Sequence, residues 1–182
     1  TADLTLAEKV IADDTIIDDM QHELDARTIN LIARQSPVAS DLRTLVTSLR
    51  MSADLERMGD LAHHIAKSAR MRYPATAVPP ELSLTIEEMG RVCSKIIEKV
   101  STVLEKRDAD RALEVEKDDD QIDGLHRKII QTLLDPNWKH GVETAIDMTL
   151  LGRYYERCAD HAVSIARRVY FLVTGTYASD KA

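Results

Sequence analysis

The stretch DLERMGDLAHHIA, residues 54–66, returns in altered form as YYERCADHAVSIA at residues 154–166. An earlier segment, ADDTIIDDM at residues 12–20, matches KDDDQIDGL at residues 117–125. Between residues 54–66 and 154–166, six positions keep their residue type: Glu56/Glu156, Arg57/Arg157, Asp60/Asp160, Ala62/Ala162, Ile65/Ile165 and Ala66/Ala166. Self-similarity of this kind indicates that one structural unit occurs twice in the chain.

The composition favours a helical protein. The 182 residues are 44% apolar and only 4% aromatic, with 6 glycines and 5 prolines. A β-sandwich or barrel would need more aromatic and β-branched residues and more turns, so we expect an all-α fold. The net charge of −7 argues against nucleic-acid binding, because such proteins need a basic surface.

The chain also carries few signs of a membrane or an oxidising compartment. No apolar run approaches the roughly 20 residues of a membrane span, and no signal-peptide pattern is seen. We therefore expect a cytoplasmic protein. Cys93 and Cys158 have no metal-binding spacing, and we expect two buried free thiols rather than a disulfide.

Helix punctuation predicts five helices, over about residues 4–34, 37–71, 82–107, 108–134 and 142–174. The breaks between them are the QSP turn, the Pro-rich segment RYPATAVPP and the turn DPNWKHG. Ser36 is predicted to cap the second helix, with Pro37 at its first position. Asp108 is predicted to cap the fourth.

The repeat predicts a tandem of two three-helix bundles with antiparallel, up-down helices. The helix at about 82–107 has no counterpart in the first half, and the chain begins at Thr1 rather than at Met. We therefore expect the first helix of the first bundle to be absent and an apolar stripe there to be bare. The expected divisions are a first bundle at 1–73, a linker at 74–80, a second bundle at 81–176 and a disordered tail at 177–182.

Acidic residues recur four positions apart on four of these helices. Residues at i and i+4 share a helix face, where like charges destabilise the helix by a few tenths of a kcal/mol. The four pairs are Asp14/Asp18, Glu56/Asp60, Asp119/Asp123 and Glu156/Asp160. Such faces are often simply solvated, but crowded carboxylates are also the ligands that Mg²⁺, Mn²⁺, Ca²⁺ or iron would neutralise.

The opposite faces of the same helices are predicted to lie in the core. On the first helix these residues are Ile17, Met20, Leu24 and Leu31. On the second they are Leu55, Met58, Ala62, Ile65 and Ala69, and on the fifth Tyr155, Cys158, Ala162, Ile165 and Val169. The two carboxylate pairs of each half are expected to form a cation site on the outside of its bundle.

The spacing of the histidines and the lack of known catalytic motifs argue against an enzyme. Ferritin-like di-iron proteins use ExxH pairs that project into the core, whereas this chain has only DxxH. Each histidine is therefore expected to be a surface residue or an interhelical hydrogen-bonding group. No phosphate loop, HExxH or GxSxG is found.

The segment ARQSPVASDLRTLVTSLRMSADLERMGDLAHHIAK, residues 33–67, is very similar to the signature region of the PhoU family, regulators of bacterial phosphate transport. RYYERCADHAVSIARRV, residues 153–169, resembles the second copy of that signature. The resemblance extends over the whole chain and points to the actinobacterial type of the family. It implies a tandem of three-helix bundles.

The resemblance also implies a function. Members of the family are non-catalytic negative regulators of the phosphate-starvation response, linking the ATPase of the phosphate ABC transporter to a sensor histidine kinase. A homodimer with only indirect membrane association is expected. Members carry iron, zinc, nickel, magnesium or manganese on E(D)xxxD motifs, which correspond here to Glu56/Asp60, Asp14/Asp18, Glu156/Asp160 and Asp119/Asp123.

Two alternatives stay open from the residues. One is a di-metal carboxylate enzyme or a metal-storage bundle, which would point its ligands inward between helices. The other is a purely structural adaptor, whose acidic faces dock basic partners without any ion.

Overall fold

A computed structural model describes residues 3–176, and within this range the chain forms five long helices and no strand. They are α1 (Leu4–Gln35), α2 (Ala39–Arg72), α3 (Pro80–Lys106), α4 (Ala109–Leu133) and α5 (Gly141–Thr174). The all-α prediction is confirmed, and each helix starts and ends within about two residues of its predicted limits. The predicted tail at 177–182 lies outside the described residues, and the division into domains stays a prediction.

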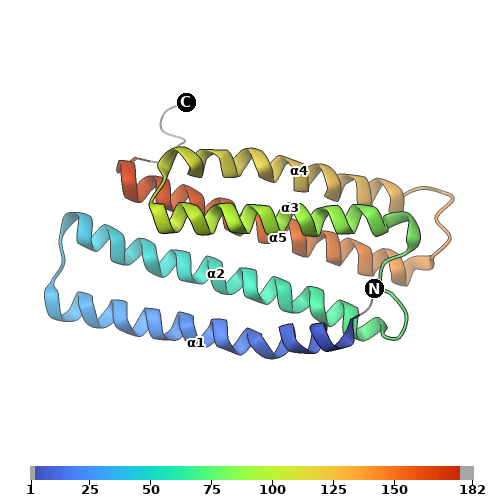
Figure 1. The fold of residues 1–182 in the computed structure, drawn as a ribbon, viewed down its shortest axis with the longest axis horizontal. Helices are drawn as coiled ribbons and strands as arrows, with labels where there is room; N and C mark the ends of the chain where they lie inside the picture. Colours follow the sequence, from blue (N-terminus) through green and yellow to red (C-terminus); the bar gives the residue numbers. More distant parts are fainter. Residues whose placement is uncertain (1–2, 177–182) are drawn as a thin grey trace.

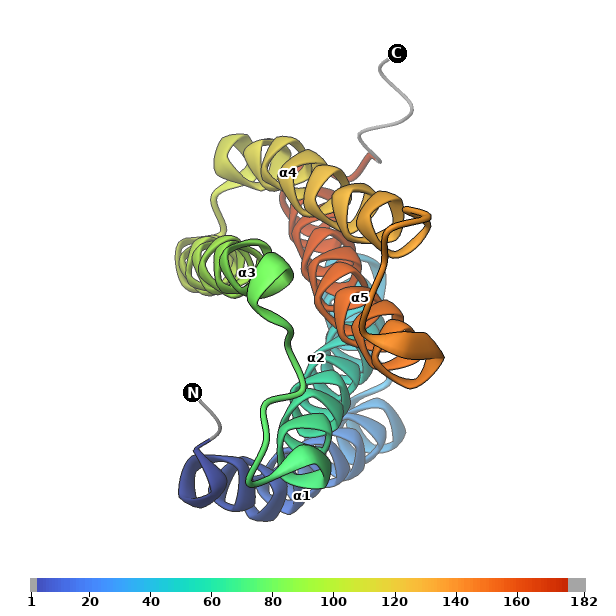
Figure 2. The same cartoon turned by 90° about the vertical axis from the view of Figure 1, so that its right-hand side faces the viewer.

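The helices form two layers (Figures 1 and 2). One is the hairpin of α1 and α2, which we call the first repeat. The other is formed by α3, α4 and α5, the second repeat, in which α3 lies along one side of the α4–α5 hairpin. The repeats meet where α2 packs on α5, so these two helices form the centre of the molecule.

Equivalent caps begin α1 and α4. The side chain of Asp3 accepts a hydrogen bond from the backbone N–H of Leu6 at 3.0 Å, and that of Asp108 accepts one from Arg111 at 2.9 Å. Each carboxylate satisfies a backbone donor that the first helical turn leaves unpaired. The predicted cap at Asp108 is confirmed, and the repeat extends to its counterpart Asp3.

The predicted cap at Ser36 is wrong. Ser36 instead ends α1 in the left-handed region, with φ of 44°, and its N–H donates to the Ile32 carbonyl at 3.2 Å. The α2 helix begins two residues after Pro37, with Val38 as an N-cap that makes no side-chain hydrogen bond. The QSP segment therefore closes the preceding helix and does not open the next one.

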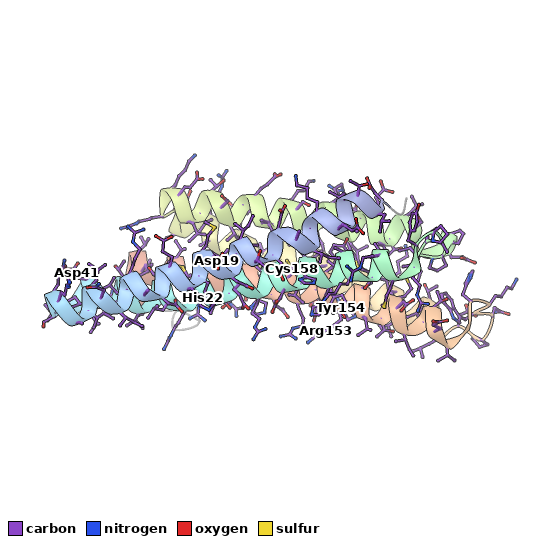
Figure 3. All side chains as sticks on the ribbon, turned by 90° about the horizontal axis from the view of Figure 1, so that it is seen from below. Asp19, His22, Asp41, Arg153, Tyr154 and Cys158 are labelled. Carbon is purple, nitrogen blue, oxygen red and sulfur yellow. The ribbon has the colours of Figure 1, made fainter. Side chains whose placement is uncertain are left out.

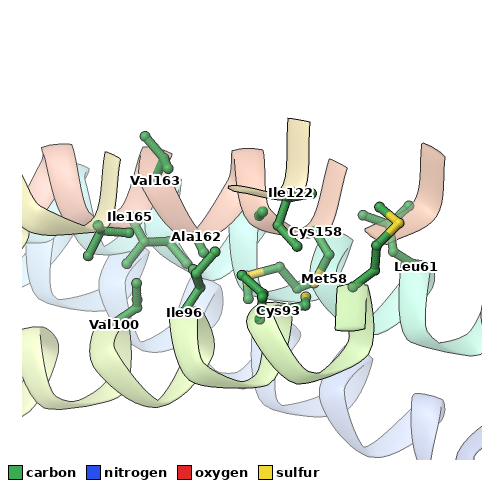
Figure 4. Packing of buried hydrophobic residues seen from close by; sticks show 14 of the residues in the cluster. Met58, Leu61, Cys93, Ile96, Val100, Ile122, Cys158, Ala162, Val163 and Ile165 are labelled. Atoms are coloured by element: carbon green, nitrogen blue, oxygen red, sulfur yellow. The ribbon is translucent and has the colours of Figure 1, made fainter. Parts of the chain in front are cut away.

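The hydrophobic core lies mainly in the second repeat (Figure 4). On α3, Met89, Ile96 and Val103 are fully buried against α4 and α5. The predicted core face of α5 is confirmed, since Cys158, Ala162, Ile165 and Val169 are buried and Tyr155 packs against the cluster. The α2 helix adds Met58 and Leu61 to the same core across the interface between the repeats.

The predicted core face of the first repeat is largely open, as the bare-stripe prediction required. Met20 is 66% exposed, Leu55 is 43% exposed and Leu24 is 37% exposed. Leu31 and Ala62 are exposed as well, so placing these residues in a core was wrong. The cause is visible in Figure 2, because among the described residues no helix covers α1 and α2 as α3 covers α4 and α5.

A polar junction holds the two repeats together. The largely buried carboxylate of Asp54 on α2 accepts hydrogen bonds from Ser164 Oγ and Arg168 Nε on α5, each at 3.0 Å. It also lies 3.0 Å from Nδ1 of His161. Farther along α2, Arg72 pairs with Asp147 and Glu143 at 2.6 and 2.5 Å. Because the buried carboxylate of Asp54 has partners on α5, this junction fixes how α2 packs on α5.

One further property concerns membranes. Over residues 3–176, no helix has the long apolar stretch that would be needed to cross a lipid bilayer.

Candidate metal centres

The four carboxylates of the first repeat lie along the seam between α1 and α2. We call Asp14, Asp18, Glu56 and Asp60 the first acidic cluster. All four side chains are partly buried. The pKa of Glu56 is raised, first by burial and then by the negative charge of Asp60, with further contributions from Asp18 and Asp14. The two predicted pairs are therefore brought together from adjacent helices, close enough to repel one another.

Cations of the chain already neutralise part of this cluster. Arg57 Nη1 donates to Asp60 at 2.8 Å, and Arg57 Nε lies 3.6 Å from Glu56. The long side chain of Arg57 therefore reaches both carboxylates. From α2, His63 Nδ1 pairs with Asp14 on α1. His63 is thus an interhelical partner of Asp14 rather than of Asp60, its neighbour in the DxxH sequence.

The second repeat forms an equivalent group between α4 and α5. Asp119, Asp123, Glu156 and Asp160 make up this second acidic cluster. Burial, followed by the charges of Asp123, Asp160 and Glu156, raises the pKa of Asp119 to about 6. The pKa of Glu156 is also raised, by burial and then by Asp160, against the opposing charges of Arg153 and His126. The negative charges of this cluster are therefore poorly compensated.

The partners of the second cluster differ from those of the first. Arg153, one turn before Glu156 on α5, forms an ion pair with it. His126 lies on α4 beneath Gly152, where an added Cβ would come within 3.1 Å of the imidazole Cδ2. The glycine therefore leaves room for this histidine next to the cluster. Sequence spacing placed His126 beside Asp123, but only the packing of α4 on α5 brings it near Glu156.

Four buried side-chain atoms in residues 3–176 lack a hydrogen-bond partner, and all four belong to these two sites. They are His63 Nε2, Asp119 Oδ1, His126 Nε2 and Glu156 Oε2. A buried polar atom without a partner costs roughly 1–3 kcal/mol, so such atoms are uncommon in folded proteins. Carboxylate oxygens and imidazole nitrogens are also the donors that bind divalent and iron ions.

The clusters occupy the seams rather than the outer surface that was predicted. Asp123 and Asp160 are exposed, whereas Asp14 and Glu156 are largely buried between the helices. By contrast, Asp19 and His22, a DxxH pair on α1, are both exposed (Figure 3). His22 is therefore a surface residue, as the sequence suggested.

In the described part of the chain, no three His, Cys, Asp or Glu side chains are yet arranged around one position as a complete ligand set. Arg57, His63 and Arg153 each pair with a carboxylate of the clusters. An ion would have to compete with these contacts, and side-chain rotations would then bring the carboxylates of a cluster together. The donor types and the unpartnered atoms fit a cation.

Comparisons with known proteins agree with this architecture. A family model described as the PhoU domain matches residues 1–69 and 86–169. The phosphate-specific transport system accessory protein PhoU homolog 2 of Mycobacterium bovis is 46% identical over 97% of this chain and 83% of its own length. PhoU homolog 1 of Mycobacterium leprae is 45% identical over 98% of this chain and 81% of its own length. The crystal structure of PhoU from Pseudomonas aeruginosa matches with a TM-score of 0.85 at 28% identity, covering 96% of this chain and 84% of that one.

Proposed function

Because this chain belongs to the PhoU family, we propose that it is a non-enzymatic accessory protein of phosphate transport that represses the phosphate-starvation response. The relatives carry the name of a transport accessory protein, and none of the names given above is that of an enzyme. In this proposal the protein links the ATPase of the phosphate ABC transporter to a sensor histidine kinase. It acts in the cytoplasm as a homodimer and meets the membrane only through these partners.

The proposal includes two metal sites, one on each acidic cluster. Asp14, Asp18, Glu56 and Asp60 would hold one ion or cluster, and Asp119, Asp123, Glu156 and Asp160 the other. The observation that carries this part is the set of four unpartnered buried atoms, since all of them lie at these seams. A bound divalent or iron ion, whether Fe, Zn, Mg or Mn, would neutralise the crowded charges and tie each helix pair together.

Metal binding is tested on the purified, chelator-treated protein by calorimetric titration with Mn²⁺ and, without oxygen, Fe²⁺. We expect uptake by the wild type and loss of uptake when Glu56, Asp60, Glu156 and Asp160 are all replaced by Ala. The matched control is Asp19→Asn combined with Glu87→Gln, which removes two exposed carboxylates outside the clusters. Equal uptake by the quadruple variant would exclude the clusters as metal sites.

Regulation is tested separately, in a bacterial host without its own family member and with a reporter of the phosphate regulon. The wild-type chain should repress the reporter in high phosphate, and the quadruple variant should leave it constitutively active. If a variant that no longer binds metal still represses the reporter, the adaptor role would stand, but it would not depend on metal. Turnover or air oxidation of Fe²⁺ by the wild type would instead favour an enzyme or a storage protein.

A further inference from the structure

Charge is divided unevenly among the helices. The α1 helix carries seven Asp and Glu residues and three Lys and Arg residues, and α4 carries seven and four. The α2 helix has the reverse balance, with four acidic and six basic residues, and α5 carries four of each. The chain as a whole has a net charge of −7, so the two central helices are more basic than the outer helices α1 and α4.

Basic side chains of α2 and α5 gather on one face. On α2, Arg50, Arg57 and His64 follow one another at intervals of seven residues, which places them on one side of the helix. On α5, Arg153 and Arg157 are four residues apart and also share a side. All five side chains are exposed, and we call them the basic face.

The two rows of this face lie next to each other, on the side away from α3. His64 of α2 stacks on Tyr154 of α5, with ring centroids 5.2 Å apart. Tyr155 points toward α3, since its Oη lies 3.6 Å from the position of a Cβ at Gly90. The two arginines of α5 are each two positions from Tyr155, about 200° around the helix, so they point away from α3. In Figure 2 the helices follow in the order α4, α5, α2, α1, which places the basic face between the two acidic helices.

The chain neutralises this face only in part. Among residues 3–176, the side chains of Arg50 and Arg157 make no ion pair or hydrogen bond. Arg57 and Arg153 pair with carboxylates of the acidic clusters on their own helices. The carboxylate that α2 directs at α5, Asp54, is largely buried and bonded to side chains of α5. Two arginines, one on each central helix, are therefore available to a partner.

We propose that the basic face is a docking surface for an acidic helical segment of a partner protein. Arg50 and His64 are 14 residues apart, so the face is about 21 Å long, which about four turns of a helix would span. The planar guanidinium of arginine donates two parallel hydrogen bonds to a carboxylate. Carboxylates three or four residues apart on the partner helix lie on one side of it and would meet these arginines.

Two features of the surroundings favour a narrow protein segment. Because the neighbouring α1 and α4 are acidic, they would repel a broad anionic surface such as a lipid membrane on both sides. One turn before the arginines, Val46 on α2 and Ile146 and Leu150 on α5 are exposed by 38%, 55% and 44%. They would contact apolar residues of the partner, so the matching segment is an amphipathic helix with acidic residues.

The inference rests on the proposed adaptor role, since it supplies a surface through which an adaptor would meet its partner. It requires neither bound metal nor repression. Binding is measured on the purified, chelator-treated full chain, so a failure here is distinguishable from a failure of the metal titration or of the reporter experiment.

The probe is a fluorescently labelled helical peptide of about 20 residues, built from Glu, Ala and Leu with its Glu residues on one side. Fluorescence anisotropy at low ionic strength should show saturable binding to the wild type. Arg50→Ala combined with Arg157→Ala should weaken binding about tenfold, because it removes two charged contacts. The same peptide with Gln in place of Glu should not bind. Both replaced side chains are exposed, and circular dichroism checks that the variant is folded.

The matched control is Arg34→Ala combined with Arg111→Ala, which removes two exposed arginines from α1 and α4 and changes the net charge equally. This control should bind the peptide like the wild type. No binding by the wild type, or equal affinities of the two double variants, would overturn the proposal. Vesicles of phosphatidylserine and phosphatidylcholine form a further arm. Binding to vesicles that depends on Arg50 and Arg157, without binding of the peptide, would assign the face to a membrane and also overturn it.

Discussion

The first and second repeats start from related sequences and reach different degrees of burial. Ile129 on α4 is fully buried, whereas its counterpart Leu24 on α1 is exposed over more than a third of its surface. Ala162 on α5 is fully buried, and its counterpart Ala62 on α2 is exposed. The helix pairs are alike in both repeats, and the covering helix α3 belongs only to the second. A hairpin of two amphipathic helices therefore leaves its apolar stripe open until a third helix packs on it.

The acidic clusters differ in a parallel way. In the first, Arg57 contacts two carboxylates and His63 pairs with Asp14. In the second, Arg153 pairs with Glu156, while buried atoms of Asp119 and His126 stay without partners in the described structure. The second cluster is thus less compensated by the chain itself, and we expect it to bind a cation more tightly than the first.

The largest test of this comparison is a matched pair of truncations. Ile129→Ala should lower the free energy of unfolding by about 3 kcal/mol, because it leaves a cavity in a closed core. Leu24→Ala at the equivalent position should cost about 1 kcal/mol, since part of that side chain already contacts water. Denaturant unfolding of both variants measures the difference. Equal losses would mean that the stripe of the first repeat is covered in solution.

A smaller effect is expected at Gly59, where α2 packs on α1. A Cβ at Gly59 would lie 2.9 Å from Ile17 Cδ1, so Gly59→Ala should destabilise the protein by about 1 kcal/mol. At Gly124 an added Cβ meets nothing within 4 Å, and Gly124→Ala should stabilise α4 by about 0.5–1 kcal/mol. The second repeat has Ala159 at the position of Gly59, so stabilisation by Gly59→Ala would show that both hairpins are spaced alike.

The pH dependence of the chelator-treated protein should come mainly from the second repeat. The folded state raises the pKa of Asp119 from 3.8 to about 6, so it retains a proton that the unfolded chain releases. This contribution is present below pH 4 and is lost as the pH rises through about 6. Its size should be about 1 kcal/mol, less than the full shift implies because water screens the site.

Unfolding free energies measured between pH 4 and 7 test this, with Asp119→Asn as the variant that removes the effect. Asp14→Asn serves as the matched replacement in the first repeat and should leave the dependence caused by Asp119 in place. If the unfolding free energy changes with pH equally in the wild type and in Asp119→Asn, the pH dependence must come from another group.

The smallest expected effect concerns the internal cation of the first cluster. Arg57→Ala removes a competitor for Glu56 and Asp60, and should strengthen Mn²⁺ binding there about threefold, since exposed ion pairs contribute little. Arg157→Ala is the control, because the equivalent arginine makes no ion pair among the described residues. Calorimetric titration compares the two. Weaker binding in Arg57→Ala would mean that this arginine supports the site instead of competing with the ion.

Local features of the fold could be predicted from the sequence. The helix limits and the cap at Asp108 follow from proline positions, capping residues and periodicity, all of which act within a few residues. The pairing of Asp14/Asp18 with Glu56/Asp60 followed from the repeat and from antiparallel packing. The error at Ser36 has a local cause as well, because a serine before proline fits either the end of one helix or the start of the next.

Features that depend on how helices pack could not be predicted in this way. Which carboxylate His63 contacts is set by the register of α1 against α2. That Cys93 and Cys158 belong to one buried cluster depends on the position of α3 on α5, and no spacing in the sequence predicts it. The exposure of Met20 and Leu24 could be anticipated only by noticing that a covering helix had no counterpart, because periodicity alone places both in a core.

The Asp54 junction has a consequence for the order of folding events. Its hydrogen bonds join residues 107 to 114 positions apart in the chain, whereas each hairpin is closed by a short turn. Loop closure over such a distance is slow, so we expect the hairpins to form first and the junction to close last. Until then the inner faces of α2 and α5 are uncovered together, and at high concentration the α2 of one molecule can close on the α5 of another. Such an exchange, known as domain swapping, is the misassembly to which this architecture is most open.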